Sequence, residues 1–291
     1  EGSGVVKAKA VLDLNRMAYD VKLDANRVQL QHFLPHYGLS PFSGTLTAQG
    51  CGTDFFSPRT RLAARARVSG FRYAGYDMSG VKANAEIANG NVSAHVDSHT
   101  RLFDGTISLN ALMSQRIVCG TVACDLRQAD LYRLRVVDKP LSAGLCAHID
   151  IDSDLKEYFK VNGFVSSIVL KDSKQYYYPQ DLSLDLLTNR DTTTACLTCG
   201  DFDLDAHVKG GYENLIKEGN SLWREVSKQM ENKYIDQLLL RKHLPTMSLY
   251  LKTGKDNAFC KILKRYGYDL ANIFVDMNTS PLAGINGKIL V

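Results

Sequence analysis

The side chains in this sequence that could do chemistry are histidines, aspartates and cysteines that recur at short spacings. Three rows place such residues two apart: His95, Asp97 and His99; His148, Asp150, Asp152 and Asp154; and Asp201, Asp203, Asp205 and His207. Residues two apart in a strand point to the same face, so each row could present metal ligands together. A metal would also need ligands from another segment and hydrogen bonds that orient them. Because Asp and His are ordinary on the wet face of a strand, we predict surface strands here and no metal site.

The only Cys-x-x-Cys motif joins Cys196 and Cys199. Residues three apart in a strand point to opposite faces, and no second pair stands at zinc-ribbon spacing. A thioredoxin-like βαβ context is also missing. We therefore interpret the motif as coincidental. The chain has seven cysteines, an odd number, so at least one thiol stays free or pairs outside the chain.

Other catalytic signatures are missing from the sequence. It contains no GxSxG elbow, phosphate loop, dinucleotide-binding glycine fingerprint or HExxH motif. The net charge of +4 is small and both signs are interspersed, which is not the footprint of a nucleic-acid binder. The run Tyr176, Tyr177, Tyr178 has no basic groove around it, so we expect strand packing in place of base stacking. We predict that the chain is not an enzyme, holds no cofactor and binds no nucleic acid.

Alternation of apolar and polar residues dominates the chain from Val5 to about Val208. Residues 81–87 read VKANAEI and residues 92–96 read VSAHV, the period-two pattern of strands with one wet and one dry face. Asn89-Gly90 between them suits a two-residue hairpin turn, which needs positive φ angles. Roughly a dozen such segments with short connections predict an antiparallel meander.

At Gly211 the period changes from two to that of a helix. Leu215, Leu222, Val226 and Met230 fall on one side of a segment from about Tyr212 to Arg241, which predicts a long amphipathic helix. Strands resume after Pro245 with MSLYLKTG, a short helix is expected in AFCKILKRYG, and LANIFVDM is again strand-like.

A proline-led start recurs three times along the chain. Pro41 opens PFSGTLTA, Pro140 opens PLSAGLCAHID, and Pro281 opens PLAGINGK. This favours a repeat of roughly one hundred residues with a truncated third copy, so we expect a piece of a longer array. The predicted organisation is a preceding β element with connector (1–39), a first β-repeat (40–139), a second β-repeat (140–210), the long helix (211–244), and closing strands with a short helix and the third start (245–291).

The predicted fold class is mainly β: a long curved antiparallel sheet with an open groove, one long amphipathic helix and a short second helix. The dry face of this sheet has no second family of helices to cover it. Barrel closure, a second sheet or lipid could each do so. We predict that ten residues line the groove: Val81, Ala83, Ala85, Ile87, Val92, Ala94, Val96, Ile107, Leu109 and Ala111.

Two stretches of the sequence resemble a known family. A segment ending in HFLP, followed by LSPFSGTLTAQGCGTDFF and paired alternating strands, resembles the AsmA-like repeats of the TamB translocation and assembly module proteins of Gram-negative envelopes. The stretch YIDQLLLRKHLPTMSLYLKTGKDNAFCKILKRYG is similar to TamB-like sequences. The long helix within a strand array departs from that pattern, which leaves open whether the groove is continuous.

The resemblance implies a periplasmic segment of a larger chain anchored in the inner membrane. Its implied partners are phospholipid, sheltered in a hydrophobic β-groove, and an outer-membrane β-barrel assembly protein. Two other hypotheses stay open at this point. The chain could be an interaction scaffold that recruits proteins by strand addition at an exposed edge, or a hydrolase if His with Cys or carboxylates converge in a pocket.

Overall fold

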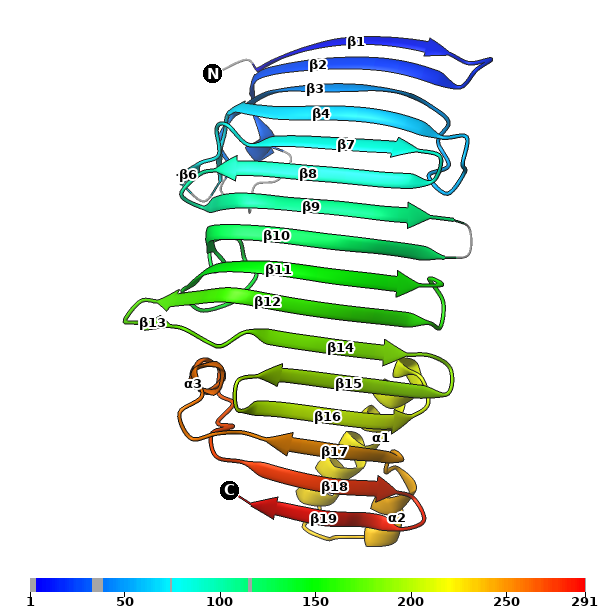
Figure 1. Ribbon diagram of the computed structural model, residues 1–291, viewed down its shortest axis with the longest axis vertical. Coiled ribbons are helices and arrows are strands. Elements are labelled where there is room, and N and C mark those ends of the chain that lie inside the picture. The colour runs from blue at the N-terminus through cyan, green and yellow to red at the C-terminus, as the bar shows by residue number, and fades with distance from the viewer. Residues whose placement is uncertain (1–3, 33–38, 74, 115–116, 291) are drawn as a thin grey trace. The chain divides into compact units, whose positions relative to one another are not determined.

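The described part of the chain folds as an open antiparallel β-sheet with three α-helices (Figure 1). The computed structural model describes residues 4–32, 39–73, 75–114 and 117–290. Strand accounts for 57% of the structure, and the sheet is open rather than closed into a barrel. This confirms the predicted mainly β class and the presence of one long helix.

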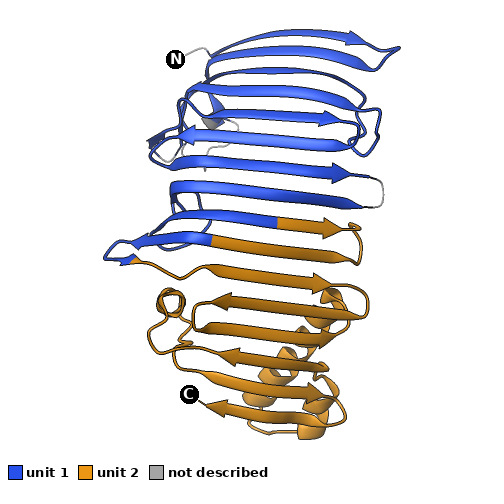
Figure 2. Ribbon diagram, in the orientation of Figure 1, with its two compact units in different colours: residues 1–149, 166–176 blue, residues 150–165, 177–291 orange. Residues whose placement is uncertain are grey.

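The structure divides into two compact units, which are described separately (Figure 2). Unit 1 comprises residues 1–149 and 166–176, and unit 2 comprises residues 150–165 and 177–291. Two long strands, β11 (Leu141–Ser153) and β12 (Phe159–Asp172), contribute residues to both units. The predicted repeat boundaries stay a prediction, since compactness alone does not test a duplication.

Unit 1 is an antiparallel meander in which each strand pairs with the next long strand along the chain. Its long strands are β1 (Val5–Asp13), β2 (Ala18–Val28), β3 (Phe42–Cys51), β4 (Arg61–Gly70), β7 (Lys82–Ala88), β8 (Asn91–His99), β9 (Phe103–Met113) and β10 (Val118–Asp130). The short strands β5 (Arg72–Tyr73) and β6 (Tyr76–Asp77) form a separate two-stranded sheet, and Tyr73 of β5 also bridges to Leu39.

The predicted hairpin at Asn89-Gly90 is confirmed. Both residues have positive φ angles, 55° and 79°, and the flanking residues Ala88 and Asn91 are directly paired. These angles belong to the hairpin turns whose twist matches that of the strands. The turn therefore sets the register of β7 against β8, and with it which residues share a face.

In two of the three proline-led starts, a glycine lets the strand approach a backbone carbonyl oxygen of a neighbouring strand closely. A Cβ atom on Gly44 of β3 would lie 2.7 Å from the carbonyl oxygen of Arg67, and one on Gly144 of β11 would lie 2.7 Å from that of Arg127. Both glycines are buried, so only a residue without a side chain permits these close approaches. Gly284, in the third start, instead has a φ of 76°.

Unit 2 continues with hairpins and adds the helices. The boundary between the units divides β13 (Tyr176–Tyr177). The remaining elements of unit 2 are β14 (Leu182–Thr188), β15 (Thr192–Cys199), β16 (Phe202–Lys209), α1 (Tyr212–Glu231), α2 (Gln237–Lys242), β17 (Met247–Lys252), α3 (Ala258–Arg265), β18 (Phe274–Ser280) and β19 (Gly284–Leu290). Strands β14 to β19 pair in chain order. The short helix and both late strands were predicted and are confirmed.

The prediction of one continuous helix to about Arg241 is wrong, because α1 ends at Glu231 and α2 is separate. Lys233 adopts a left-handed conformation with a φ of 52°, which ends a helix. Asp236 then caps α2 by accepting a hydrogen bond from the Leu239 amide at 3.0 Å. The Gln229 side chain holds the junction, because it accepts from the Asp236 amide at 2.7 Å and donates to the Asp236 carbonyl oxygen at 3.3 Å.

A small core of unit 2 forms where α3 packs on the sheet. Cys199, Phe202 and Cys260 are buried together, and the Phe202 and Phe259 rings meet edge to face at 5.2 Å. At its start, α3 is capped by Asn257, whose side chain accepts from the Phe259 and Cys260 amides.

The two connecting segments that precede Pro41 and Pro140 differ from each other. The first contains a 3₁₀ turn, Leu30–His32, and its residues 33–38 lie outside the described residues. The second, after Asp130, consists of turns in which the Leu134 amide donates to the Asp130 carbonyl oxygen at 3.0 Å.

Candidate functional site

One face of the unit 1 sheet is apolar across eight strands. Residues directly opposite in neighbouring strands lie on the same face, so the registers trace rows that run across the sheet. One row reads Ala10, Val21, Ala48, Ala64, Ala85, Ala94, Leu109 and Val122. The row on one side of it reads Ala8, Leu23, Leu46, Ala66, Ala83, Val96, Ile107 and Cys124, and the row on the other side reads Leu12, Tyr19, Gly50, Leu62, Ile87, Val92, Ala111 and Gly120. These three rows define the apolar face.

The apolar face is exposed to an unusual degree for so large a hydrophobic surface. Only Ile87 among its members is buried, at 8% exposure, while Leu12 is 65% exposed and most others are half-buried. Within its described residues unit 1 has no α-helix, and its only second sheet is the two-residue pair β5 and β6. Contiguous apolar patches of this kind mark sites of interaction.

The structure brings nine of the ten predicted groove residues together on this face. These nine lie in β7, β8 and β9, where the pairs Ala85 with Ala94 and Val96 with Ile107 fix their phase. Val81 precedes β7 by one residue, and its carbonyl oxygen accepts from the Val68 amide at 2.9 Å. Their role as lipid contacts stays a prediction.

Sequence reasoning missed the share of β4 in the apolar face. Ala64 and Ala66 belong to its rows, but they sit in the arginine-rich run RTRLAARARVSGFR, residues 59–72. The alternation that finds them was present, since Arg65 and Arg67 are exposed and point to the other face.

The opposite face of unit 1 is polar and carries the surface hollows. One row on this face reads Lys9, Lys22, Thr47, Arg65, Asn84, His95, Ser108 and Ala123. A shallow hollow is lined by side chains that include Arg65, Glu86 and His95. The His95 Nδ1 atom lies 2.9 Å from Ser108 Oγ. A serine activated by histidine also needs a group that orients the imidazole and an oxyanion hole. Glu86 is the carboxylate that lines this hollow together with His95 and Ser108.

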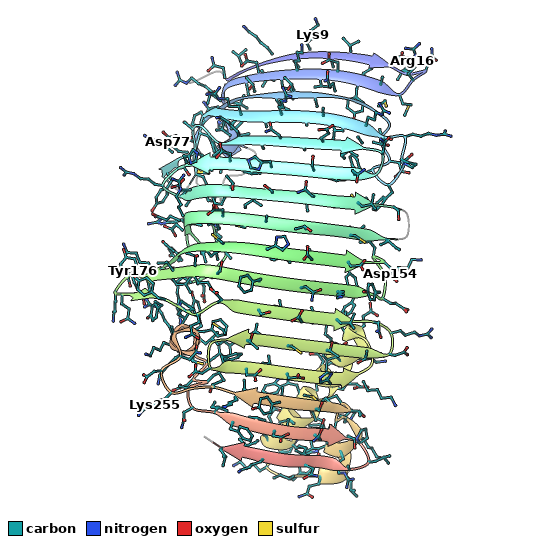
Figure 3. The ribbon with its side chains drawn as sticks, viewed as in Figure 1. Lys9, Arg16, Asp77, Asp154, Tyr176 and Lys255 are labelled. Carbon is teal, nitrogen blue, oxygen red and sulfur yellow. The ribbon has the colours of Figure 1, made fainter. Side chains whose placement is uncertain are left out.

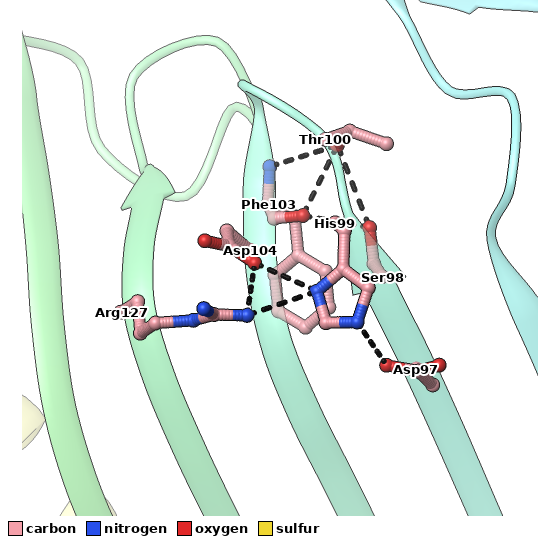
Figure 4. A network of polar contacts seen from close by, with 7 residues as sticks. All are labelled: Asp97, Ser98, His99, Thr100, Phe103, Asp104 and Arg127. Carbon is pink, nitrogen blue, oxygen red and sulfur yellow. Dashed lines mark hydrogen bonds and ion pairs between the residues drawn. The ribbon is translucent and has the colours of Figure 1, made fainter.

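A second polar cluster links the ends of β8, β9 and β10 (Figure 4). The Nε2 atom of His99 lies 3.3 Å from Asp97, and its Nδ1 atom lies 3.0 Å from both Asp104 Oδ1 and a guanidinium nitrogen of Arg127. That guanidinium nitrogen also donates to Asp104 at 3.0 Å. A protonated imidazole donates to both carboxylates, whereas a neutral ring with a bare Nδ1 accepts from Arg127. The cluster fastens three strands to one another.

The other acidic rows serve turns and ion pairs. Asp154, in the turn between β11 and β12 (Figure 3), accepts hydrogen bonds from three backbone amides, those of Lys156, Glu157 and Tyr158, at 2.8 to 3.0 Å. These bonds, the one from Tyr158 foremost, lower the pKa of Asp154. In β16 the His207 ring pairs with Asp205 at 2.8 Å. In the described ranges no group of three or more His, Cys, Asp or Glu side chains is arranged to hold a metal ion.

The two cysteines of the Cys-x-x-Cys motif lie on opposite faces, as predicted. Cys196 is paired with Asp205 on the polar side, whereas Cys199 is paired with Phe202 and buried in the unit 2 core. Burial raises the pKa of both thiols, and Asp205 raises that of Cys196 further. Neither thiol is therefore activated as a nucleophile.

In the tyrosine run the middle residue, Tyr177, is buried, whereas Tyr176 and Tyr178 are exposed. The Tyr176 ring carries the Lys171 ammonium group 4.9 Å from its centroid.

The fold and the site define a class: an open antiparallel β-sheet with one uncovered apolar face. No protein-family model, curated protein or solved structure matches the chain. No helix in the described part of the chain is both long enough and apolar enough to cross a bilayer.

Proposed function

We propose that the chain shelters phospholipid acyl chains on the apolar face of unit 1, as a periplasmic segment of a membrane-anchored AsmA- or TamB-like protein that supports envelope assembly. The observation that carries this proposal is the set of three apolar rows that cross eight strands, over which the described residues of unit 1 place no covering layer. This function needs binding and release but no catalytic residue. An outer-membrane assembly barrel is the protein partner that goes with this proposal.

The dimensions of the apolar face suit an acyl chain. Neighbouring strands lie about 4.8 Å apart, so a row across eight strands extends about 34 Å. One leaflet of a bilayer core is about 15 Å thick, so an extended acyl chain fits along a row. In the middle of the face, Ala48, Ala64, Ala85 and Ala94 follow one another directly, and their small side chains leave room for a ligand against the backbone.

The free energy of transfer is sufficient. Each methylene removed from water contributes about 0.8 kcal/mol, so a sixteen-carbon chain gains on the order of 10 kcal/mol. This term carries no chemical specificity, which suits a carrier of mixed phospholipids. The polar headgroup stays in water at the margin of the apolar face, because its burial without partners is costly.

The proposal is tested with single aspartate substitutions on opposite faces. Ala85→Asp and Ala94→Asp each place a carboxylate in the middle of the apolar face, whereas Ala123→Asp places one on the polar face beside Ser108. The purified proteins are compared by native mass spectrometry and lipid extraction after circular dichroism has confirmed their folding. We expect phospholipid on the wild type and on the Ala123 variant and at least a tenfold loss on the other two. Equal lipid on all four would reject the apolar face as the binding site.

Edge strands support a second candidate function, a scaffold that binds by strand addition. All nine residues of β1 are exposed, as are six of the seven residues of β19. Such edges present unpaired backbone groups to other strands.

This second candidate can be tested by measuring whether copies of the chain associate with one another. Of two adjacent backbone N–H groups in a strand, one points toward the paired strand and one away from it, so Lys288→Pro and Ile289→Pro differ in which one they remove. We expect concentration-dependent association in sedimentation velocity that only one of the two variants weakens strongly. A wild type that stays monomeric at all concentrations argues against edge pairing between copies.

A further inference from the structure

Helix α1 carries an apolar stripe that faces solvent. Ile216, Trp223 and Met230 are 58%, 70% and 73% exposed. They are seven residues apart, which brings them to nearly the same side of the helix because two turns take 7.2 residues. The stripe extends about 21 Å along the axis. Large exposed hydrophobic side chains aligned in this way are uncommon on a soluble surface.

A different side of α1 already packs against unit 2. Leu215, Leu222 and Val226 are half-buried and Gln229 is buried. At the start of the helix the Tyr212 ring meets Phe159 of β12 edge to face at 5.8 Å, and the Tyr212 amide donates to Thr188 at 3.1 Å. Figure 1 shows α1 crossing one face of the later strands. The exposed stripe is therefore additional to the side that stabilises the fold.

A basic row runs beside the exposed stripe. Lys217, Arg224 and Lys228 are all exposed and lie about 100° around the helix from the stripe, at 100° per residue. Two of the four glutamates of α1, Glu218 and Glu225, lie farther round, beyond the basic row. Glu213 and Glu231, at the two ends of the helix, are exposed and lie between the stripe and the basic row. An apolar stripe with Trp, flanked by Lys and Arg, is the pattern of helices that lie in a lipid interface.

The C-terminal end of α1 is held in place by polar contacts. Gln229 is buried and bonds to both backbone groups of Asp236 and to Glu225. The turn that follows adds Ile235, which is 79% exposed, and α2 adds Leu238, which is 71% exposed. Exposed apolar side chains thus continue past the end of α1.

We propose that α1 docks unit 2 on the surface of an anionic lipid bilayer. Ile216, Trp223 and Met230 enter the boundary between headgroups and acyl chains, and Lys217, Arg224 and Lys228 contact the phosphate groups. Apolar insertion alone would give weak binding to any bilayer, so the basic row makes the surface selective for negative charge. This docking is independent of acyl chains on the apolar face of unit 1.

The single tryptophan of the chain makes the test direct, because all indole fluorescence comes from Trp223. The full chain is titrated with vesicles of phosphatidylcholine alone and of phosphatidylcholine with one third phosphatidylglycerol. With anionic vesicles we expect a blue shift of the emission and reduced quenching by iodide. With neutral vesicles we expect a partition constant on the order of a hundredfold lower, since each basic residue contributes about fivefold. A phospholipid bound on unit 1 would leave this signal unchanged.

Substitutions test the basic row and the apolar stripe of α1 separately in a vesicle sedimentation assay. Replacing Lys217, Arg224 and Lys228 together by Gln should lower binding to anionic vesicles about a hundredfold, whereas the same change at Lys252, Lys255 and Lys261, also exposed on unit 2, should have a much smaller effect. Trp223→Ser should lower binding about tenfold. Tyr268→Ser removes another exposed aromatic side chain of unit 2 and serves as its control.

Three outcomes would overturn the proposal. The first is unchanged Trp223 emission with anionic vesicles. The second is equal binding to neutral and anionic vesicles, or equal loss in the matched control variants. The third is a blue shift that grows with protein concentration in the absence of vesicles, which would assign the stripe to self-association.

Discussion

At the residue scale, small side chains decide how closely the strands of this sheet approach. Gly105 of β9 is buried and has a φ of 152°. A Cβ atom there would collide with the carbonyl oxygen of Asp125 in the neighbouring strand. No side chain fits without moving the backbone of β10, because that oxygen belongs to the sheet ladder. The position cannot be recognised from the alternation pattern, in which a glycine is simply a small residue.

Two glycine substitutions should therefore change stability in opposite directions. Gly105→Ala places a residue with a side chain at a positive φ and against a backbone oxygen, so we expect the free energy of unfolding to fall by about 1–3 kcal/mol. Gly219→Ala lies within α1 and would meet nothing within 4 Å, so it should add about 0.5–1 kcal/mol. Urea unfolding followed by circular dichroism measures both. A Gly105 variant as stable as the wild type would contradict the close approach.

Asp154 should make a pH-dependent contribution to stability. Three amide donors, led by Tyr158, lower its pKa in the folded chain below the ordinary value, while in the unfolded chain it titrates near about 3.9. Its stabilisation is therefore complete above about pH 4 and is lost as pH falls through the folded pKa. We expect the stability gap between the wild type and Asp154→Asn to be constant near neutral pH and to shrink in acid. Urea midpoints that give the same stability difference between the two proteins at neutral pH and in acid would refute this prediction.

At the element scale, the turns and caps of this chain follow local rules, but the ends of α1 and α2 do not follow from periodicity. The apolar spacing continues from Leu215 past Met230, which predicted one helix. The left-handed Lys233 and the Asp236 cap break it, and the buried Gln229 stabilises the break. The sequence did not indicate that Gln229 holds this junction, because its hydrogen-bond partner is the backbone of Asp236, seven residues away.

Asn257 should be the most sensitive polar residue of α3. Its oxygen caps the helix, and its amide nitrogen donates to the Cys199 carbonyl oxygen at 2.8 Å in the buried unit 2 core. Asn257→Ala loses a cap, about 1 kcal/mol, and leaves a buried carbonyl without this donor, about 1–3 kcal/mol.

The Asn257 amide nitrogen also donates to the Asp201 carboxylate at 2.5 Å. Asn257→Asp separates capping from these two donations, because it keeps the capping oxygen but places a carboxylate against the Cys199 carbonyl oxygen and the Asp201 carboxylate. We expect both variants to be destabilised in chemical unfolding and to expose Cys260 to thiol reagents sooner. If only the alanine variant is destabilised, the contact to Cys199 contributes nothing.

At the scale of the whole molecule, the strands of each unit depend on their immediate neighbours. In unit 1 every long strand pairs with the next long strand along the chain. Stability in such an array is close to a sum of nearest-neighbour terms. In the described part of unit 1 no second layer packs across the apolar face. We therefore expect that unfolding of an edge strand leaves the distant strands folded.

A truncated chain that begins at Ser40 tests this independence. It lacks β1 and β2 but keeps β3 to β10 and unit 2. We expect the amides of β7 to β10 to retain their hydrogen-exchange protection, with a loss confined to β3 and β4 next to the new edge. Loss of protection throughout unit 1 would show instead that its sheet folds as a single cooperative body.

The sequence by itself determined the strands, the hairpin at Asn89-Gly90, the opposite faces of Cys196 and Cys199, and the phase of Ala85 and Ala94. These follow from period-two alternation and local turn chemistry, which act over a few residues. Only the tertiary structure decided that the described part of unit 1 leaves its apolar face without a covering layer, that β4 extends this face, and that Trp223 faces solvent beside a half-buried Leu222. Those outcomes depend on which segments approach one another across long sequence distances, and alternation along one strand carries no information about that.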